Sequence, residues 1–379
     1  MVEALAPLSP SERLLCGPGP TNVEPAALEA MQKPMLGHLD PELHDILLEL
    51  VARLRQVYRA ESGMVLPLQS TGTSGMEAGI ANLVERGDTV IVGASGFFGK
   101  RIAEVARRSG ADVVEVTAEW GRHVPNARLL AALDEHPYAR LLAVVHGETS
   151  TGSEHPLAEL GAEMRGSRTL LMADCVTTLG GVELDFDTWG IDYAYSCTQK
   201  CLGAPPGMSP IAVSDRALER RRRRRTPVPL SLDVELLQNY WVERPATYHH
   251  TAPILHIYAL HEVLRQILTE GLEQRWARHA GAGRHFQVRA LDAGFELLAE
   301  PEHQLAPLTA IRVPEGIDGK SVQQQLLADG LEIGGGLGPQ APAMWRVGLM
   351  GPNADTETAD RVIGALIAAV EREGTPVPG

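Results

Sequence analysis

The stretch DTVIVGASGFFGKRIAEVARRSGADVVEVTA, residues 88–118, predicts a strand, a helix and a second strand in succession. Residues 88–94 and 111–118 are short and apolar, as strands buried on both faces are. Between them, residues 100–110 have apolar side chains at helical spacing and end on a glycine. Because strands joined by a helix run parallel, this stretch indicates a parallel sheet covered by helices.

The same alternation of helices and apolar strands continues on both sides of this unit. Further helices are expected at 40–58, 75–85, 127–136 and 155–166, and further strands at 139–145, 169–176 and 192–196. After about residue 255 the pattern changes to longer helices and then short strands, as in a smaller α+β domain. We therefore expect an α/β fold with a mostly parallel sheet, divided into an N-terminal arm (1–22), a large domain (23–255) and a small C-terminal domain (256–379).

The bulk composition favours a globular protein in the cytoplasm. The 379 residues are 44% hydrophobic and 22% charged, and the net charge of -14 argues against nucleic-acid binding. The N-terminus lacks the pattern of a secretory signal, and no apolar stretch is long enough to span a membrane. The four cysteines form no CxxC pair and have no histidines at zinc spacing, so we expect free thiols and no metal site.

A run of six arginines, Arg220–Arg225, contrasts with this acidity. It could attract anions or nucleic acid. No aromatic residues are interleaved with it, however, and the sequence therefore favours a solvated helix face that ends at Pro227.

Lys200 lies in YSCTQKCLGAPPGMSP (195–210), among small and weakly polar residues. Such a lysine is either a badly placed surface residue or an amine desolvated for chemistry. Asp174 lies near the end of the predicted strand 169–176, which one further strand (192–196) separates from Lys200, and it could cap a helix or pair with a cation such as a protonated ring nitrogen. STGTSG (70–75) could be a flexible helix start or could bind an anion through backbone N–H groups. An amine, an acid and an anion cradle at adjacent strand ends are what pyridoxal phosphate requires.

A set of motifs in a fixed order resembles the class V aminotransferases, which are fold-type I pyridoxal-phosphate enzymes. The similarity spans nearly the whole chain and is closest to the alanine–glyoxylate and serine–glyoxylate aminotransferases. The motifs are GPGPTN (17–22), LGHLDPE (36–42), HGETSTG (146–152), ADCVTTLGG (173–181), TQKCLGAPPG (198–207), YHHTAP (248–253), GGLGP (335–339) and MWRVGLMG (344–351).

The resemblance implies roles for residues around the cofactor ring. Lys200 would be the Schiff-base lysine and Asp174 the partner of the pyridinium nitrogen. Val176 would pack on one face of the ring, and Phe98 stands where many relatives have a stacking aromatic residue. Thr149 matches a hydroxyl position near the phenolic oxygen of the cofactor.

It also implies a phosphate site shared between two subunits. Gly72 and Thr73 match phosphate-cradle positions, and Gln199 would reach the phosphate. Tyr248 and Thr251 would reach it from the partner subunit of a homodimer.

Arg346 is flanked by Trp345 and Val347, which makes a simple surface position improbable for it. It could form a structural ion pair. Its planar fork also matches a carboxylate, and by resemblance Arg346 binds the substrate carboxylate, with Gly19 on the substrate side.

We therefore expect a pyridoxal-phosphate-dependent aminotransferase that moves an amino group from alanine or serine to glyoxylate or pyruvate. Transamination of a specialised biosynthetic amine remains an alternative. A lyase or a cysteine desulfurase on the same fold is less favoured, because the cysteines near Lys200 lie at positions expected to be packed. A cofactor-binding regulator would need a DNA-binding module for which the chain has no room.

Overall fold

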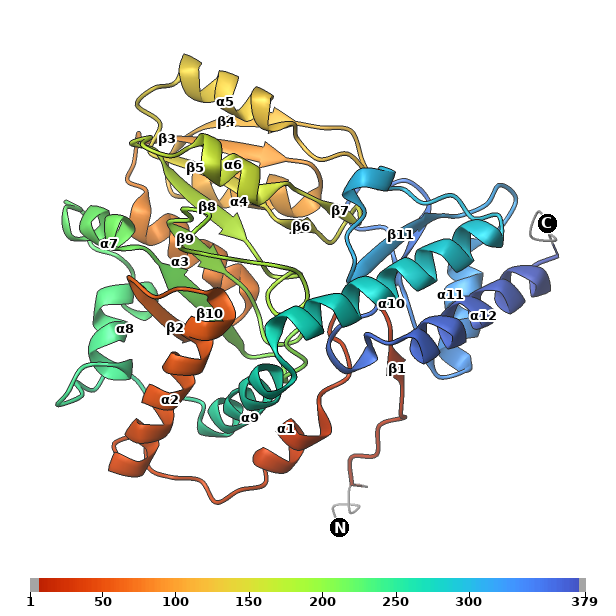
Figure 1. The fold of residues 1–379 in the computed structure, drawn as a ribbon, viewed down its shortest axis with the longest axis horizontal. Helices are drawn as coiled ribbons and strands as arrows, with labels where there is room; N and C mark the ends of the chain where they lie inside the picture. Colours follow the sequence, from red (N-terminus) through yellow and green to blue (C-terminus); the bar gives the residue numbers. More distant parts are fainter. Residues whose placement is uncertain (1–6, 375–379) are drawn as a thin grey trace, which may run out of the picture.

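The structure, a computed structural model, describes residues 7–374 and is built around one seven-stranded sheet (Figure 1). In spatial order the strands are β2 (Met64–Gln69), β10 (Met208–Val213), β9 (Tyr193–Tyr195), β8 (Leu170–Asp174), β5 (Leu141–Val145), β3 (Thr89–Ala94) and β4 (Asp112–Thr117). β10 is antiparallel to both neighbours, and all other neighbouring pairs are parallel. The predicted α/β fold with a mostly parallel sheet is confirmed.

The helices that accompany this sheet follow the predicted alternation. They are α1 (Pro25–Ala30), α2 (Pro41–Tyr58), α3 (Gly72–Leu83), α4 (Phe97–Arg108), α5 (Asn126–Glu135), α6 (Leu157–Glu163), α7 (Asp215–Arg222), α8 (Val234–Trp241) and α9 (Ile254–Glu270). β5 and β8 are buried at every position, so the centre of the sheet is covered on both faces. Within residues 7–374, no helix is both long enough and apolar enough to cross a bilayer.

A second group of elements follows α9 and surrounds its own apolar core (Figure 1). It contains α10 (Leu272–Asp292), α11 (Gly319–Ala328) and α12 (Thr356–Arg372), with an antiparallel sheet in the order β11 (Leu308–Arg312), β14 (Met344–Gly348) and β13 (Gly334–Gly335). The N-terminal β1 (Leu14–Leu15) pairs with β12 (Leu331–Glu332), so residues 14–15 pack on this group. The residue limits of the predicted domains stay a prediction, and residues 1–6 and 375–379 lie outside the described part.

A short hairpin follows the carboxyl end of β5. It consists of β6 (Gly147–Glu148) and β7 (Ser153–Glu154), which pair antiparallel. Three short 3₁₀ segments, Leu230–Leu232, Pro301–His303 and Gly351–Asn353, complete the described elements.

The arginine run is in part the solvated face that the sequence favours, because Arg222, Arg223 and Arg225 are exposed, but its first two members are not. Arg220 lies 3.1 Å from Asp88 and 3.3 Å from Glu85, and its side chain is only 15% exposed. Arg221 forms an ion pair with Asp233, and its side chain is 14% exposed. The first two arginines are therefore neutralised by acids of neighbouring elements, which a sequence window around the run does not contain.

Candidate active site

Asp174 ends β8 and lies directly beside Tyr195 of the parallel neighbour β9. Tyr195 donates its hydroxyl hydrogen to one carboxylate oxygen at 2.6 Å, and the N–H of Val176 donates to the other at 2.9 Å. Burial raises the pKa of Asp174 to about 7, although both hydrogen bonds oppose that shift. The site therefore holds a buried carboxyl group whose charged form a nearby cation would stabilise.

Lys200 follows β9 and differs from the other lysines of the chain. The sequence contains four lysines, and Lys33, Lys100 and Lys320 are exposed. Lys200 is largely buried, and its Nζ donates a hydrogen bond to the carbonyl oxygen of Pro18. Burial lowers the pKa of the Lys200 amine, so that a neutral, nucleophilic amine is more accessible there than on a surface.

Gly19 lies against the end of the Lys200 side chain. A Cβ atom placed on Gly19 would be 2.7 Å from Lys200 Cε and still closer to Nζ. Gly19 also has φ 101°, a conformation that other residues rarely adopt. The N-terminal motif 17–22 is thus next to the amine, and only glycine leaves room for it.

Arg346 lies in β14 and is 6% exposed. Its Nε donates to the carbonyl oxygen of Gly335 at 2.7 Å, and its Nη1 donates to that of Thr149 at 3.2 Å. No ion pair among the described residues includes Arg346, so it is not the structural ion pair that the sequence left open. Burial lowers its pKa to about 10, which leaves it charged at neutral pH, with N–H donors available for an anion.

The N-terminus of α3 lies next to this group. A Cβ atom on Gly72 would be 2.9 Å from Val176 Cγ2, so the helix start approaches the loop after β8 closely. The side-chain Oε1 of Gln199 is buried and has no hydrogen-bond partner among the described residues. Thr73 is exposed at the first turn. An anion with several acceptor oxygens would suit the backbone N–H groups of this helix start and the Nε2–H donors of the Gln199 amide, but not its Oε1.

Phe98 and Thr149 come from two elements that contact each other. Phe98 is in the first turn of α4, partly buried, with its ring 5.3 Å from that of Phe97. The Thr149 hydroxyl is hydrogen-bonded to Thr177 while its carbonyl binds Arg346. Thr149 thus connects the loop after β8 with the C-terminal group.

Tyr248 and Thr251 lie away from these contacts in the single chain. Tyr248 is 58% exposed, with its ring 5.4 Å from that of His38, and Thr251 is also exposed. Neither side chain forms a hydrogen bond with Lys200 or Gln199 among the described residues.

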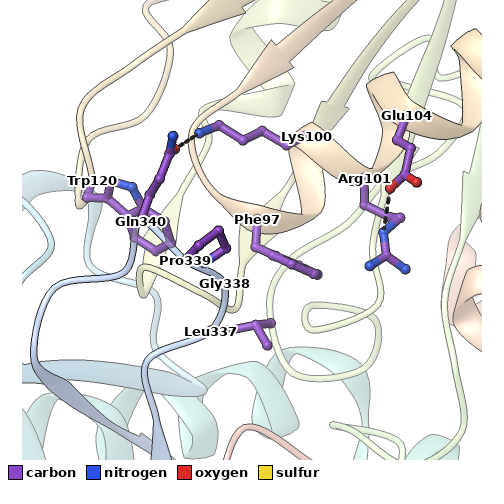
Figure 2. Close-up of a pocket in the computed structure, with 9 residues that line it drawn as sticks. All are labelled: Phe97, Lys100, Arg101, Glu104, Trp120, Leu337, Gly338, Pro339 and Gln340. Carbon is purple, nitrogen blue, oxygen red and sulfur yellow. Dashed lines mark hydrogen bonds and ion pairs between the residues drawn. The ribbon is translucent and has the colours of Figure 1, made fainter.

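A pocket adjoins the outer side of the first turns of α4 (Figure 2). Lys100 and Gln340 point toward one another across it and are hydrogen-bonded, while Arg101 pairs with Glu104 of its own helix. Phe97 and the loop that contains Gly338 also line it (Figure 2). Lys200, Asp174 and Arg346 do not line this pocket, so it borders the candidate site without being its centre.

The sequence did not single out two buried polar side chains of this site, Tyr195 and Glu148. Tyr195 could have been found by aligning the ends of the two predicted parallel strands, since it is opposite Asp174. Glu148 is fully buried in the HGETSTG motif, where an acid among small residues was a visible but unused signal.

Comparisons with known proteins agree with this geometry. The family model described as Aminotransferase class-V matches residues 15–354. The chain is 36% identical to an alanine–glyoxylate aminotransferase of Oryctolagus cuniculus, over 96% of this chain and 94% of the relative. It is 34% identical to an (S)-ureidoglycine–glyoxylate transaminase of Bacillus subtilis, over 96% and 92% of the two chains. A solved alanine–glyoxylate aminotransferase from Nostoc sp. is 46% identical and superposes with a TM-score of 0.93 over 97% of both chains.

The family match covers most of the chain, and the similar proteins have the same enzyme type and the same fold. The buried amine, acid and arginine described above lie within the matched range. The chain therefore belongs to the class-V aminotransferase family and is an aminotransferase.

Proposed function

We propose that the protein is a pyridoxal-phosphate-dependent aminotransferase that moves an amino group from alanine or serine to glyoxylate or pyruvate. The observation that carries the proposal is the grouping of a half-buried amine, a buried acid and a buried arginine without an ion pair around residues 17–22 and 146–152. The names of the similar enzymes support glyoxylate as acceptor.

The family implies pyridoxal phosphate, and the described residues fit it. The backbone N–H groups at the start of α3, at Gly72 and Thr73, suit a phosphate group, and the side-chain amide of Gln199, whose Oε1 has no partner among the described residues, could turn its Nε2–H donors toward it. Asp174 would hold the protonated ring nitrogen, because its buried carboxyl group lacks a cationic partner among the described residues. Lys200 would be the residue to which the cofactor is attached.

Three further side chains would complete the cofactor site. Val176 and Phe98 would lie against the two faces of the ring, and the Thr149 hydroxyl would lie near its phenolic oxygen. When bound, the cofactor supplies an aldehyde that takes up an amino group and a ring that accepts electron density.

The chain's own groups would then bind the substrate and move the proton. Arg346 binds the α-carboxylate through its remaining N–H donors and fixes the substrate next to Gly19. The amine of Lys200, whose pKa burial lowers, accepts and returns a proton at Nζ. One arginine serves both half-reactions because amino donor and oxo acceptor each have one α-carboxylate.

The second buried arginine of the described residues does not favour a dicarboxylic substrate. Arg275 is already paired with Glu270 at 2.8 Å and donates to the carbonyl oxygens of Gly180 and Cys201. With Arg346 as the available buried arginine, small donors with a single carboxylate are favoured over aspartate or glutamate.

We further propose a homodimer in which Tyr248 and Thr251 reach the phosphate of the partner's site. Their exposure in the single chain supports this, since they are then available to a second copy. The cytoplasmic location and the absence of nucleic-acid partners expected from the sequence stay predictions.

The desulfurase alternative lacks a suitable nucleophile. Cys197 and Cys201 are buried, and burial raises the pKa of each thiol to about 12. Burial raises the pKa of Cys175 as well. Protonated, enclosed thiols cannot reach over a substrate as reactive thiolates.

A matrix of amino donors against oxo acceptors, measured as kcat/KM with the purified holoenzyme, tests the substrate proposal. Alanine or serine with glyoxylate or pyruvate should give the highest values. Preference for a dicarboxylic donor, or for an amine without a carboxylate, would contradict the role given to Arg346.

A further inference from the structure

The N-terminus of α4 is held by side chains from a distant segment. Its N-cap residue, Gly96, provides no side-chain hydrogen bond. Instead Glu148 accepts hydrogen bonds from the N–H groups of Phe98 and Gly99, both at 3.1 Å, and the hydroxyl of Ser150 accepts from that of Phe97 at 2.9 Å. The β6–β7 hairpin thus provides the capping acceptors that the helix's own sequence lacks.

Glu148 is built into this position. It is fully buried, and its second oxygen accepts from the hydroxyl of Ser150 at 2.6 Å and from its N–H at 3.1 Å. A carboxylate with this many donors, at the positive end of a helix dipole, is stabilised in its charged form. Burial acts in the opposite direction and raises the pKa of Glu148.

Gly96 is the residue that permits the close approach. A Cβ atom there would lie 2.6 Å from Glu148 Cδ and closer still to the Ser150 hydroxyl. Its backbone is extended, so the requirement for glycine comes from the lack of space and not from strain.

The same two segments that hold the first turn of α4 also hold Arg346. Thr149, between Glu148 and Ser150, accepts a hydrogen bond from Arg346. Gly335 accepts the other, and the loop that follows it also contacts the start of α4, where Gly338 approaches Phe97 and Gln340 binds Lys100 (Figure 2). The first turn of α4, which contains Phe98, and the Arg346 side chain are therefore held by the same two segments, the β6–β7 hairpin and the loop 335–340.

We propose that Glu148 is a positioning residue that fixes Phe98 against the cofactor ring and, through the backbone of Thr149, fixes Arg346 for the substrate carboxylate. This inference rests on the proposed function. It predicts that the negative charge of Glu148 matters beyond local stability, because displacing the α4 start moves one face of the cofactor site and displacing Thr149 removes one of the two contacts of Arg346.

Glu148→Gln is the variant that tests the inference, with Glu154→Gln as its matched control. The amide keeps the shape of the side chain but replaces one acceptor oxygen by a donor that faces backbone N–H groups. Glu154 belongs to the same hairpin and is also largely buried, yet it makes no hydrogen bond to α4 or Arg346 among the described residues.

Four measurements on both variants and on the wild type separate positioning from folding. Amide hydrogen exchange of residues 97–100 reports the cap directly. Titration of the apoprotein with pyridoxal phosphate gives its Kd, and visible circular dichroism of the holoenzyme reports the asymmetry of the cofactor environment. KM and kcat for donor and acceptor complete the set.

In Glu148→Gln we expect faster exchange at 97–100, a cofactor Kd raised about tenfold or more, a weakened dichroic band and a raised KM for both substrates. Glu154→Gln should stay within about twofold of the wild type. If Glu148→Gln does not fold, Gly96→Ala replaces it, because its Cβ displaces the same carboxylate, and the same shifts are expected.

The inference is overturned if Glu148→Gln keeps wild-type Kd, dichroism and KM, or if Glu154→Gln changes them equally. In both cases the wild type still binds pyridoxal phosphate and the proposed function survives. Failure of the wild type to bind pyridoxal phosphate would instead overturn the proposed function, and this inference with it.

Discussion

At the scale of the residue, the raised pKa of Asp174 makes the folding stability of the apoprotein depend on pH. This pKa is raised from 3.8 in the unfolded chain to about 7 in the fold. Between about pH 4 and 7 the folded chain keeps a proton that the unfolded chain releases, so this group contributes stability at low pH that is lost as the pH rises toward 7.

Asp174→Asn should therefore become more stable relative to the wild-type apoprotein as the pH is raised from 4 to 7, with a constant difference above about pH 8. Thermal unfolding of both apoproteins across this range measures the difference in Tm. A difference that does not vary with pH would mean that Asp174 titrates near its ordinary pKa.

Arg346 gives the second prediction at this scale. Removal of a charge-assisted, bidentate contact costs about 1.5–3 kcal/mol per hydrogen bond to a charged group. Arg346→Ala should raise the KM of donor and acceptor together by about two orders of magnitude, without loss of bound cofactor. Arg346→Lys should restore little, because a point charge does not reproduce the fork.

The measurement is each half-reaction separately, by single-turnover absorbance. If only one half-reaction is weakened, Arg346 is not the shared carboxylate site, and a carboxylate-free amine donor becomes the better interpretation.

At the scale of the element, the start of α3 packs against Val176 and is also the proposed phosphate site, so one substitution there tests both roles. Alanine is a better helix former than glycine by up to about 1 kcal/mol, so Gly72→Ala would stabilise an isolated helix. Here its Cβ would be 2.9 Å from Val176 and would narrow the proposed phosphate site.

We expect Gly72→Ala to weaken pyridoxal phosphate binding about tenfold or more, as measured by titration of the apoprotein. Gly281→Ala is the control, because Gly281 lies in α10 with no atom near its missing Cβ, and it should raise Tm slightly without changing the Kd. If Gly72→Ala and Gly281→Ala bind pyridoxal phosphate with equal Kd, Gly72 is not part of the phosphate site.

The elements also show which parts of the fold the sequence could reveal. Apolar runs and helical spacing predict the strand–helix–strand unit at 88–118. They also predict that Asp174 ends one strand and that Lys200 follows a second strand, and these two strands are neighbours in the sheet. They do not predict β2 and β10, because each contains a proline, which argues against a strand. Pro67 and Pro210 are in fact paired opposite each other in the antiparallel ladder.

The start of α4 was predicted at Lys100 and lies at Phe97. The extra turn depends on acceptors from Glu148 and Ser150, which are far away in the sequence. No local capping signal precedes the helix, since Gly96 has no side chain. Long-range caps of this kind are invisible to a reading of local pattern.

At the scale of the whole molecule, the N-terminal segment joins the two groups of elements. β1 pairs with β12 of the C-terminal group, and a few residues later Pro18 and Gly19 contact Lys200. The sequence identified the motif at residues 17–22 as part of the site only by resemblance, because Lys200 is 182 residues away from Pro18.

The proposed dimer can be tested by subunit complementation. If Tyr248 and Thr251 serve the partner's site, Lys200→Ala should be inactive alone, and the double variant Tyr248→Phe/Thr251→Ala should be weakly active alone. A co-expressed heterodimer of the two should regain one intact site. Absence of any recovery, or light scattering that shows an active monomer, would contradict shared sites.

The central claim is that Lys200 is the amine that binds the cofactor, and the composition of the chain makes it directly testable. Only four lysines exist, and the other three are exposed. The holoenzyme is reduced with borohydride, digested, and mapped by mass spectrometry. The account predicts reduced cofactor on Lys200 alone, and its absence from the Lys200→Ala variant. Cofactor found on Lys33, Lys100 or Lys320, or an unmodified Lys200 in the active enzyme, would contradict it.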